Sequence, residues 1–429
     1  MLLVFFLSFL DLLSAGSPYV YGGGCTIIKN TLYYVGGATD NLGRSPIKQN
    51  FMLDLSAPFS IDQYGEAPWK PVIASGNDIS YSNFPAVVPQ GDYGILMFGG
   101  EATSANKSIQ VLDVVDRSWS TEATSSLGWV KLAKLYSLPT NVSLSKSSFV
   151  QSDIYPEEYF VLGGRFYNGS ESSAVYPNQV FKYNRTSYSW SFFVDFKRKV
   201  QGHTTIVHNG KLFVIGGADP DSGFQAYPLD DVHYIDLRTG LTGTFSTKGD
   251  IPAGRVGHSS VVVGSKVYSV GGANEAYLSS FFLGLMIVLD LNSYTWSTIN
   301  VSGFIGNYAG CLAVYKGVLV HAFGFQGMAM SNTQLISLKD NAVLNSLNML
   351  PDNSHQVSAI WIVLTSVFGG ILLLLLIFVL VYFIWWRYTN SKKVTKMPLP
   401  QVNQTSIWTE ELRPGFDSDF SRHSAGPKL

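Results

Sequence analysis

The chain has 429 residues, a formal net charge of −1 and only 14% charged residues, so it offers no basic surface for a nucleic-acid partner. It contains no Gly-x-Ser-x-Gly elbow, no His-Glu-x-x-His pair and no phosphate-binding loop, which removes three common signatures of enzymes.

Residues 1–16 predict a secretory signal peptide. The run from Met1 to Ser14 is apolar, and Ser14, Ala15 and Gly16 supply the small residues that signal peptidase requires. A buried first strand is the alternative interpretation. The absence of turn residues before Gly16 favours the signal peptide, with the mature domain occupying residues 17–350.

A diglycine that closes a short apolar run recurs along residues 17–350. The complete copies are Gly36-Gly37, Gly99-Gly100, Gly163-Gly164, Gly216-Gly217 and Gly271-Gly272, and a sixth, degraded copy is Ala322-Phe323-Gly324. Taking Gly324 as the first glycine of the sixth copy, the copies are 63, 64, 53, 55 and 53 residues apart. Such a period is typical of propeller blades with loops of variable length.

Each copy carries strand signals around its diglycine. Upstream lie alternating apolar residues and a tight turn, for example Asn209-Gly210, which predicts a β-hairpin. Downstream comes a third strand, and in three copies a tryptophan opens a fourth: Trp119, Trp190 and Trp296. Four-stranded sheets that are apolar on their faces bury those faces when they close into a ring.

The order of strand, diglycine, strand and Trp resembles the kelch repeat over residues 22–350, and Arg255-Val256-Gly257-His258 matches the Arg-x-x-His that opens many kelch strands. The resemblance implies an all-β, six-bladed kelch β-propeller, and six blades are favoured over seven. In the sixth copy the second glycine and the Trp are read as missing. Rings of this family are usually closed with strands from both chain ends, so Tyr19 to Tyr21 are expected to complete the sixth blade.

The two cysteines, Cys25 and Cys311, open the first strands of the first and last repeats. These blades are neighbours in a closed ring, so a disulfide could hold the two ends together, provided that the Cα atoms lie within about 7 Å. A disulfide and two buried free thiols both remain open.

Asn-x-Ser/Thr triplets before residue 350 are candidate N-glycosylation sites in an exported domain. They are Asn106, Asn141, Asn168, Asn184 and Asn300.

The loops after the diglycines are long and unlike one another, and they are expected to emerge on one face of the ring. Irregular loops on a rigid frame are the usual place for binding specificity. Candidate residues of this binding face are Arg44, Glu101, Arg165, Asp219, Asp221 and Glu275. Their charges could equally serve only solubility. The run from Asp219 to Gly223 could ligate Ca²⁺, but a solvated turn is favoured.

The kelch fold also includes galactose oxidase, whose radical copper site uses two histidines, two tyrosines and a cysteine. Here His203 and His258 recur at the same register of consecutive repeats, as a structural position would. His233 and Tyr234 are adjacent and therefore point to opposite faces of a strand. We expect no catalytic residue, cofactor or metal, and keep a membrane-tethered carbohydrate oxidase as an alternative.

Residues 359–386 contain no charge, which predicts one transmembrane helix after a linker at 351–358. Arg387, Lys392 and Lys393 follow at once, so the propeller faces outward and the carboxyl terminus inward. The tail, 387–429, is polar and proline-containing, and disorder is expected. Its acidic and aromatic clusters suit a cytoplasmic adaptor.

These features predict a single-pass type I membrane protein similar to the kelch ectodomain proteins of filamentous fungi. Its propeller is expected to bind an extracellular protein or glycan as an adhesion or receptor module, at the plasma membrane or in a secretory-pathway membrane. A sorting receptor of the endomembranes is the third alternative.

Overall fold

The computed structural model describes residues 17–40, 46–47, 49–76, 82–101, 109–140, 143–166, 174–274, 284–348 and 375–388. The chain divides into two units, residues 1–350 and 351–429.

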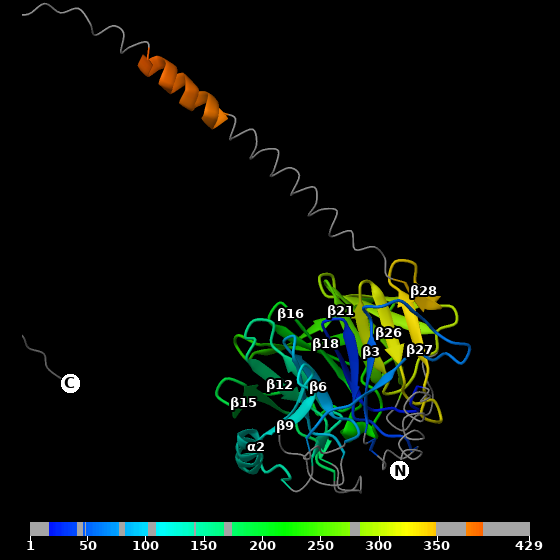
Figure 1. Ribbon diagram of the computed structural model, residues 1–429. Helices are drawn as coiled ribbons and strands as arrows, with labels where there is room; N and C mark the ends of the chain where they lie inside the picture. Colours follow the sequence, from blue (N-terminus) through cyan, green and yellow to red (C-terminus); the bar gives the residue numbers. More distant parts are fainter. Residues whose placement is uncertain are drawn as a thin grey trace, which may run out of the picture. The chain divides into compact units, whose positions relative to one another are not determined.

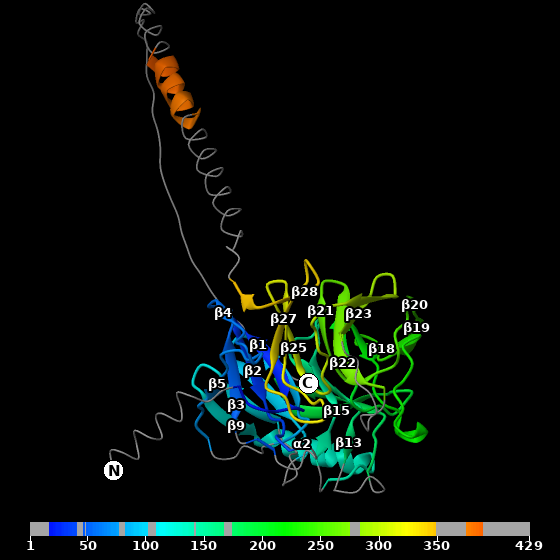
Figure 2. The same ribbon diagram turned by 90° about the vertical axis from the view of Figure 1, so that its right-hand side faces the viewer.

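The first unit is a propeller of six sheets, which are antiparallel except for one short parallel strand in blade 5, and this confirms the predicted all-β, six-bladed architecture (Figures 1 and 2). Blade 1 contains β1 (Gly24–Ile28), β2 (Thr31–Val35), β3 (Asn50–Asp54) and β5 (Lys70–Val72). Blade 2 contains β6 (Ala86–Gln90), β7 (Gly94–Phe98), β8 (Ile109–Asp113) and β9 (Ser118–Glu122). Blade 3 contains β11 (Ser148–Gln151), β12 (Glu158–Leu162), β14 (Gln179–Asn184) and β15 (Ser189–Asp195). Blade 4 contains β16 (Thr204–His208), β17 (Lys211–Ile215), β18 (Asp231–Asp236) and β19 (Thr242–Ser246). Blade 5 contains β21 (Val256–Val263), β22 (Lys266–Ala273), β23 (Leu285–Asp290), β24 (Thr295–Asn300) and a short fifth strand, β20 (Lys248–Gly249). Blade 6 contains β25 (Cys311–Tyr315), β26 (Val318–Ala322), β27 (Thr333–Ser337) and β28 (Ala342–Leu344).

The predicted hairpins form the two inner strands of each blade. In blade 4, β16 pairs with β17 from His208 opposite Lys211 to Thr204 opposite Ile215. The turn between them places Asn209 at φ 52° and Gly210 at φ 73°, the positive angles that a two-residue hairpin turn requires.

The inner strands contact one another around the whole ring. Each of β1, β6, β11, β16, β21 and β25 touches the next, and β25 returns to β1. Apolar residues fill the spaces between blades, and the three tryptophans of the fourth strands, Trp119, Trp190 and Trp296, are buried there. Closure therefore buries both faces of every blade, as the repeat predicts.

The two longest repeats contain insertions. After blade 2 the chain forms α2 (Ala123–Leu135), a helix that sequence analysis missed. Its Trp129 packs 5.0 Å from the rings of Phe98 and Trp190, between blades 2 and 3. In blade 1 the insertion separates β3 from β5; we call residues 55–69 the strap.

The strap holds the junction between blades 6 and 1, which we call the seam. Its strand β4 (Phe59–Ser60) pairs with β29 (Ser346–Leu347), which follows blade 6. Further along the strap, the Gly65 carbonyl accepts a hydrogen bond from the Thr333 amide, and the Trp69 indole donates to Thr333 Oγ1 at 3.0 Å.

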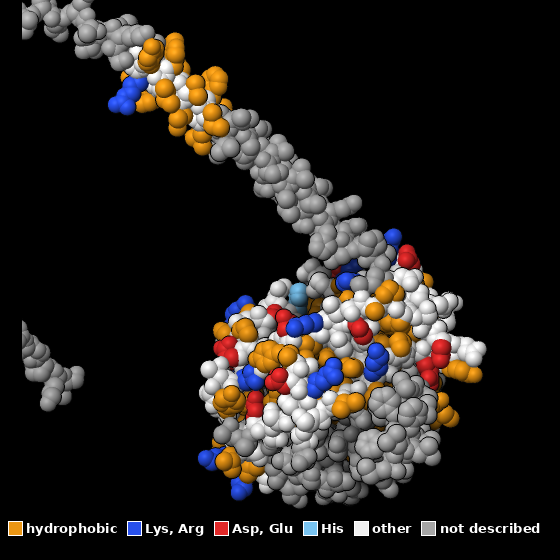
Figure 3. All heavy atoms as spheres, viewed as in Figure 1, with side chains coloured by type: hydrophobic (Ala, Val, Ile, Leu, Met, Phe, Trp, Pro, Cys, Tyr) orange, Lys and Arg blue, Asp and Glu red, His pale blue; other side chains and the backbone are white. Residues whose placement is uncertain are grey.

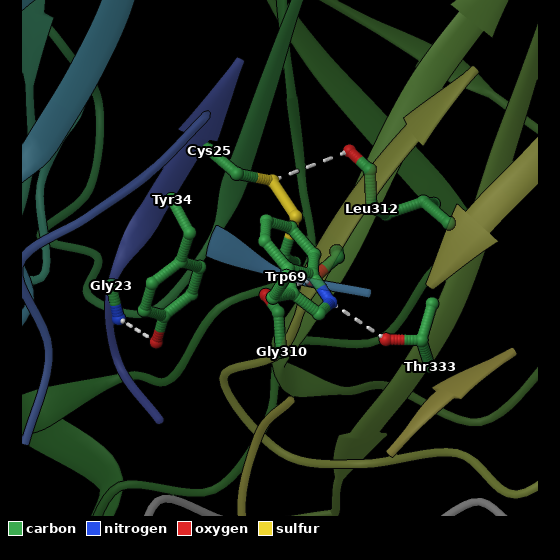
Figure 4. The surroundings of a disulfide bond; sticks show 9 residues. Gly23, Cys25, Tyr34, Trp69, Gly310, Leu312 and Thr333 are labelled. Carbon is green, nitrogen blue, oxygen red and sulfur yellow. Dashed lines mark hydrogen bonds between the residues drawn. A yellow bond between two sulfur atoms is a disulfide. The ribbon is translucent and has the colours of Figure 1, made fainter. Parts of the chain in front are cut away.

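A disulfide also crosses the seam. Cys25 of β1 and Cys311 of β25 are joined, with Cα atoms 5.7 Å apart (Figure 4). Of the two alternatives that the sequence left open, the structure therefore contains the disulfide and not two free thiols. The Tyr34 hydroxyl accepts a hydrogen bond from the Gly23 amide beside it, and burial raises the pKa of that hydroxyl.

The ring closes without a blade that combines strands from both ends of the chain. All four strands of blade 6 come from residues 311–344, and the amino-terminal segment contributes an isolated bridge, Val20 to Met330, but no strand of that sheet. The expectation that Tyr19 to Tyr21 complete blade 6 is therefore wrong. The strap and the disulfide hold the chain ends where a shared strand was expected.

The interpretation of the sixth repeat also needs correction, because the first glycine is the one that is replaced. Gly324 donates its amide to the Val20 carbonyl, as the second glycine of each other repeat does to the next blade. Phe323 occupies the first position at φ 62° and is fully buried. Its ring lies 4.7 Å from those of Tyr34 and Trp69, in space that the seam provides.

In the second unit, residues 375–388 are helical. This helix contains the carboxyl-terminal part of the predicted span and the first two residues of the predicted tail. Within the described ranges, no helix is both long and apolar enough to cross a membrane. Several predictions fall on residues outside those ranges. They are the signal peptide, the linker, most of the span and most of the tail, which lie in residues 1–16, 351–374 and 389–429.

Candidate functional site

The diglycines join each blade to the next by backbone hydrogen bonds of 2.7 to 3.0 Å, donated by the second glycine. The pairs are Gly37 to Ser82, Gly100 to Leu144, Gly164 to Val200, Gly217 to Arg255, Gly272 to Asn307 and Gly324 to Val20. Glycine is needed because the backbones approach closely: a Cβ on Gly216 would lie 2.5 Å from the Arg255 carbonyl oxygen.

A second set of bonds forms a closed ring about the propeller axis. One residue of each blade donates its amide to the carbonyl of its counterpart in the neighbouring blade, over 2.6 to 3.3 Å. This residue lies just before the inner strand, except in blade 5, where it is the second residue of β21. These six residues are Gly22, Phe84, Lys146, Gly202, Gly257 and Ala309, and all have positive φ. Phe84, Lys146 and Ala309 hold this conformation although they are not glycines, because the ring fixes them from both sides.

The residue before each ring position pairs with the residue after a diglycine. The pairs are Tyr21 with Ala38, Asn83 with Glu101, Ser145 with Arg165, Gln201 with Ala218, Val256 with Ala273 and Tyr308 with Phe325. We call these twelve residues the base layer. Since inter-blade connections and diglycine loops meet here, both emerge on one face of the ring, the diglycine face.

The base layer is polar in blades 2 and 3. Arg165 Nη2 lies 2.8 Å from Glu101 Oε1, and the Ser145 hydroxyl donates to the same oxygen at 3.1 Å. The side chains of Arg165 and Glu101 are only 8% and 18% exposed. Two of the predicted binding-face residues are thus brought together, but as a buried pair that supports the loops above them.

In the other blades the base layer is mostly apolar. Tyr21, Tyr308 and Phe325 are buried together with small alanines, and half-buried Phe84 and Phe224 pack against them. Burial raises the pKa of Tyr308 to about 12, so its hydroxyl stays protonated.

A cavity of about 160 Å³ lies against the ring and receives residues from all six blades. The Lys146 ammonium stands 4.7 Å from the centre of the Phe84 ring, across the junction of blades 2 and 3. His203 and His258 also line the cavity.

These two histidines are structural parts of the blade junctions. Nε2 of His203 is hydrogen-bonded to Ser148 Oγ at 3.1 Å, and Nε2 of His258 to Thr204 Oγ1 at 2.9 Å, each on the preceding blade. Burial lowers the pKa of both to about 3, so both are neutral. Arg255 of the same motif is buried and donates to the Gly271 carbonyl at 3.2 Å.

The exposed surface of the diglycine face comes from its loops. Asp219 caps a short turn by accepting from the Asp221 amide at 2.9 Å and the Ser222 hydroxyl at 2.7 Å, the geometry of a solvated turn. Asp221 reaches Lys199 at 3.1 Å, and both side chains remain substantially exposed. Met328, in the blade 6 loop, is 60% exposed.

Other predicted residues lie outside the described ranges: Arg44, Glu275, Asn106, Asn141 and Asn168. Of the two remaining glycosylation candidates, Asn300 is exposed, whereas Asn184 is half-buried and accepts hydrogen bonds from Ser187.

Within the described ranges, no three His, Cys, Asp or Glu side chains gather as metal ligands would. The cross-linked cysteine of a galactose-oxidase-like site has no counterpart, because both cysteines of the chain form the disulfide. The donor set therefore does not fit that copper centre.

Sequence analysis missed the apolar base layer and the ring, including Tyr308, Phe325 and Lys146. A signal was present: each lies at a fixed offset from a diglycine or from the start of an inner strand. Aligning the six repeats at those offsets would have grouped the ring residues and separated Glu101 and Arg165 from the exposed charges.

Comparisons with known proteins agree with this geometry. The family model described as the KLHDC2/KLHL20/DRC7 Kelch-repeats domain matches residues 149–350. Acyl-CoA-binding domain-containing protein 5 of Arabidopsis thaliana is 31% identical over 97 residues, or 23% of this chain and 14% of that protein. Rab9 effector protein with kelch motifs of Bos taurus is 34% identical over 97 residues, or 22% and 23%. Kelch domain-containing protein 3 of Bos taurus is 28% identical over 102 residues, or 24% and 25%.

The chain spans a quarter or less of the length of each of these three relatives. The matched repeats and the six-bladed ring nevertheless agree on one architecture. The chain is a kelch-repeat β-propeller protein.

Proposed function

We propose that this protein is a single-pass type I membrane protein whose propeller binds an extracellular protein through the loops of the diglycine face. The observation that carries the binding proposal is the contrast between a repetitive, hydrogen-bonded base layer and the dissimilar loops that it supports. Specificity is commonly built on such loops. A relative named as a Rab9 effector with kelch motifs is consistent with a protein as partner.

The available surface suits a specific and moderately polar contact. Asp221 and Lys199 offer charges of both signs, and Met328 offers an adaptable apolar side chain. On the side of the propeller seen in Figure 3, acidic and basic side chains are interspersed, so no single-sign field favours a polyanion or polycation.

The export part of the proposal is supported by the disulfide, since disulfides persist mainly in oxidising compartments. The charge-free segment 359–386 and the basic residues after it support one span with the propeller outside. Exposed Asn300 is then a suitable glycan acceptor.

Topology is tested by expressing the full chain in a eukaryotic secretory host. We expect a mass shift on enzymatic deglycosylation that Asn300→Gln reduces, and propeller epitopes accessible from outside intact cells. A chain that carries no glycan and is inaccessible from outside would contradict the topology.

Binding is tested by screening the tetramerised propeller against arrays of cell-surface proteins and, separately, of glycans. We expect protein ligands whose binding falls at least tenfold with Asp221→Lys plus Met328→Glu. Lys266→Glu, an exposed change at the opposite end of β22, is the matched control and should leave binding unchanged. Binding to glycans alone, or equal loss with the control, would contradict the proposal.

A further inference from the structure

The first described residue is tied into the seam. Ser17 is only 6% exposed, although it lies next to the predicted cleavage point. Its backbone nitrogen donates to Glu66 Oε2 at 3.1 Å, and its hydroxyl donates to the Ala67 carbonyl at 2.9 Å. Both partners belong to the strap.

Glu66 connects Ser17 with blade 6. Its second carboxylate oxygen, Oε1, accepts from the Ser331 hydroxyl at 2.8 Å. Its own amide is held by Asp62 Oδ1 at 2.8 Å, which fixes this part of the strap. One carboxylate therefore links the start of the domain, the strap and the last blade.

We propose that signal peptidase cleaves the Gly16–Ser17 bond and that the new α-ammonium group of Ser17 binds Glu66 as an ion pair that secures the seam. This inference rests on the export proposed above. In the cleavage, water adds across the peptide bond: Gly16 leaves as a carboxylate, and the Ser17 nitrogen takes up protons to become an ammonium group.

The geometry favours a charged group at this nitrogen. In the uncut chain an amide offers Glu66 one neutral N–H, whereas an ammonium group offers three donors and a full positive charge. The Glu66 carboxylate is the acceptor in both forms, but only the ammonium group adds the direct Coulomb attraction between opposite charges. An α-amino group is ordinarily charged at neutral pH, so the pair forms without any other proton donor.

The burial of Ser17 also orders the events. A protease needs an extended, accessible chain, but in the closed ring Ser17 is held by Glu66 and Ala67. Cleavage therefore precedes closure of the seam, and the cut end becomes part of the closed structure.

The first test is intact mass and amino-terminal sequencing of the full chain from a secretory host. We expect the protein to start at Ser17. A glycosylated chain with residues 1–16 retained would overturn this inference and leave the export proposal standing. An uncut chain without glycan would overturn both.

The second test uses the propeller unit starting at Ser17, which closes on itself as described above. Acetylation of the Ser17 nitrogen restores an amide and removes the charge. We expect it to raise the unfolding equilibrium constant about tenfold. Acetylation should have no such effect in Glu66→Gln, whereas in Asp92→Asn, an exposed control, the tenfold effect should remain.

An unchanged unfolding constant on acetylation of the unsubstituted chain would overturn the ion pair. An equal effect in Glu66→Gln would also overturn it, because the charge would then act on another group. The acetylation measurement stands alone even where Glu66→Gln fails to fold.

Discussion

The seam and the five other blade junctions share the same backbone bonds but differ in side chains. At every junction a residue in the second-glycine position donates to the next blade, and the axial ring continues through Gly22 and Ala309 at the seam. At the five other junctions, the first position of the diglycine is a glycine. At the seam Phe323 fills it, accompanied by a disulfide and the strap. Only at the seam does no continuous chain join neighbouring blades, and there the disulfide, the packing of Phe323 and the strap supply additional connections.

Removing the disulfide, which is present only at the seam, should lower the unfolding free energy of the propeller more than the other changes considered below. Cys25→Ser with Cys311→Ser releases a loop closed across 286 residues, for which the chain-entropy relation gives about 6 kcal/mol. Denaturant unfolding of the propeller measures this loss. Reduction of the unsubstituted protein should reproduce it, and an unchanged midpoint in both experiments would contradict a stabilising role of the bridge.

Restoring the glycine at the seam should destabilise the ring. Phe323→Gly relieves a positive φ but empties the space between Tyr34 and Trp69, so we expect a net loss of about 3 kcal/mol. Phe224→Gly is the matched control, because Phe224 also has positive φ but is half-buried, and its loss should be smaller. Thermal unfolding distinguishes them, and stabilisation by Phe323→Gly would refute the packing argument.

Adding a Cβ at a regular junction should have a somewhat smaller effect. In Gly216→Ala the methyl would meet the Arg255 carbonyl at 2.5 Å and His258 Cε1 at 2.8 Å. Gly264 has the same φ of 61° but no atom within 4 Å, so Gly264→Ala reports the backbone strain alone. We expect Gly216→Ala to cost about 2 kcal/mol more in unfolding free energy. Equal costs would show that the junction tolerates the methyl.

Acid should weaken the regular junctions that contain His203 and His258. Burial lowers the pKa of each to about 3, whereas the unfolded chain takes up protons from about pH 6.5 downward. The unfolded state then binds more protons, so stability is full above pH 6.5 and falls between pH 6.5 and 3. The slope is about 1.4 kcal/mol per pH unit for each histidine.

Urea unfolding between pH 7.5 and 5 measures this slope. His203→Gln and His258→Gln should each flatten it, because each removes one of the two buried imidazoles. An unaltered slope in both variants would mean that other groups cause the acid sensitivity.

Local signals predicted most of the fold. The hairpin turn at Asn209 and Gly210 and the tryptophans of the fourth strands follow from short segments, and the structure confirms them. The strap and α2 appeared in the sequence only as longer periods, because what they pack against lies in other blades.

The site was harder to predict because its contacts cross between repeats. Glu101 and Arg165 were recognised as charges on one face, but their burial and pairing depend on two blades. Gly324 was wrongly taken as the first glycine of its repeat, since only its bond to Val20 shows that it is the second and that Phe323 replaces the first. Asp219 and Asp221 were anticipated as a solvated turn because their hydrogen bonds are local.

Hydrogen–deuterium exchange of the propeller, free and bound to the protein partner identified by the surface array, tests whether the diglycine face is the binding face. We expect new protection in the loops of the diglycine face, 219–226 and 326–330, with the hairpin turns at 209–210, 264–265 and 316–317 unchanged. Protection confined to those hairpin turns would place the partner on the opposite face and refute binding through the diglycine face.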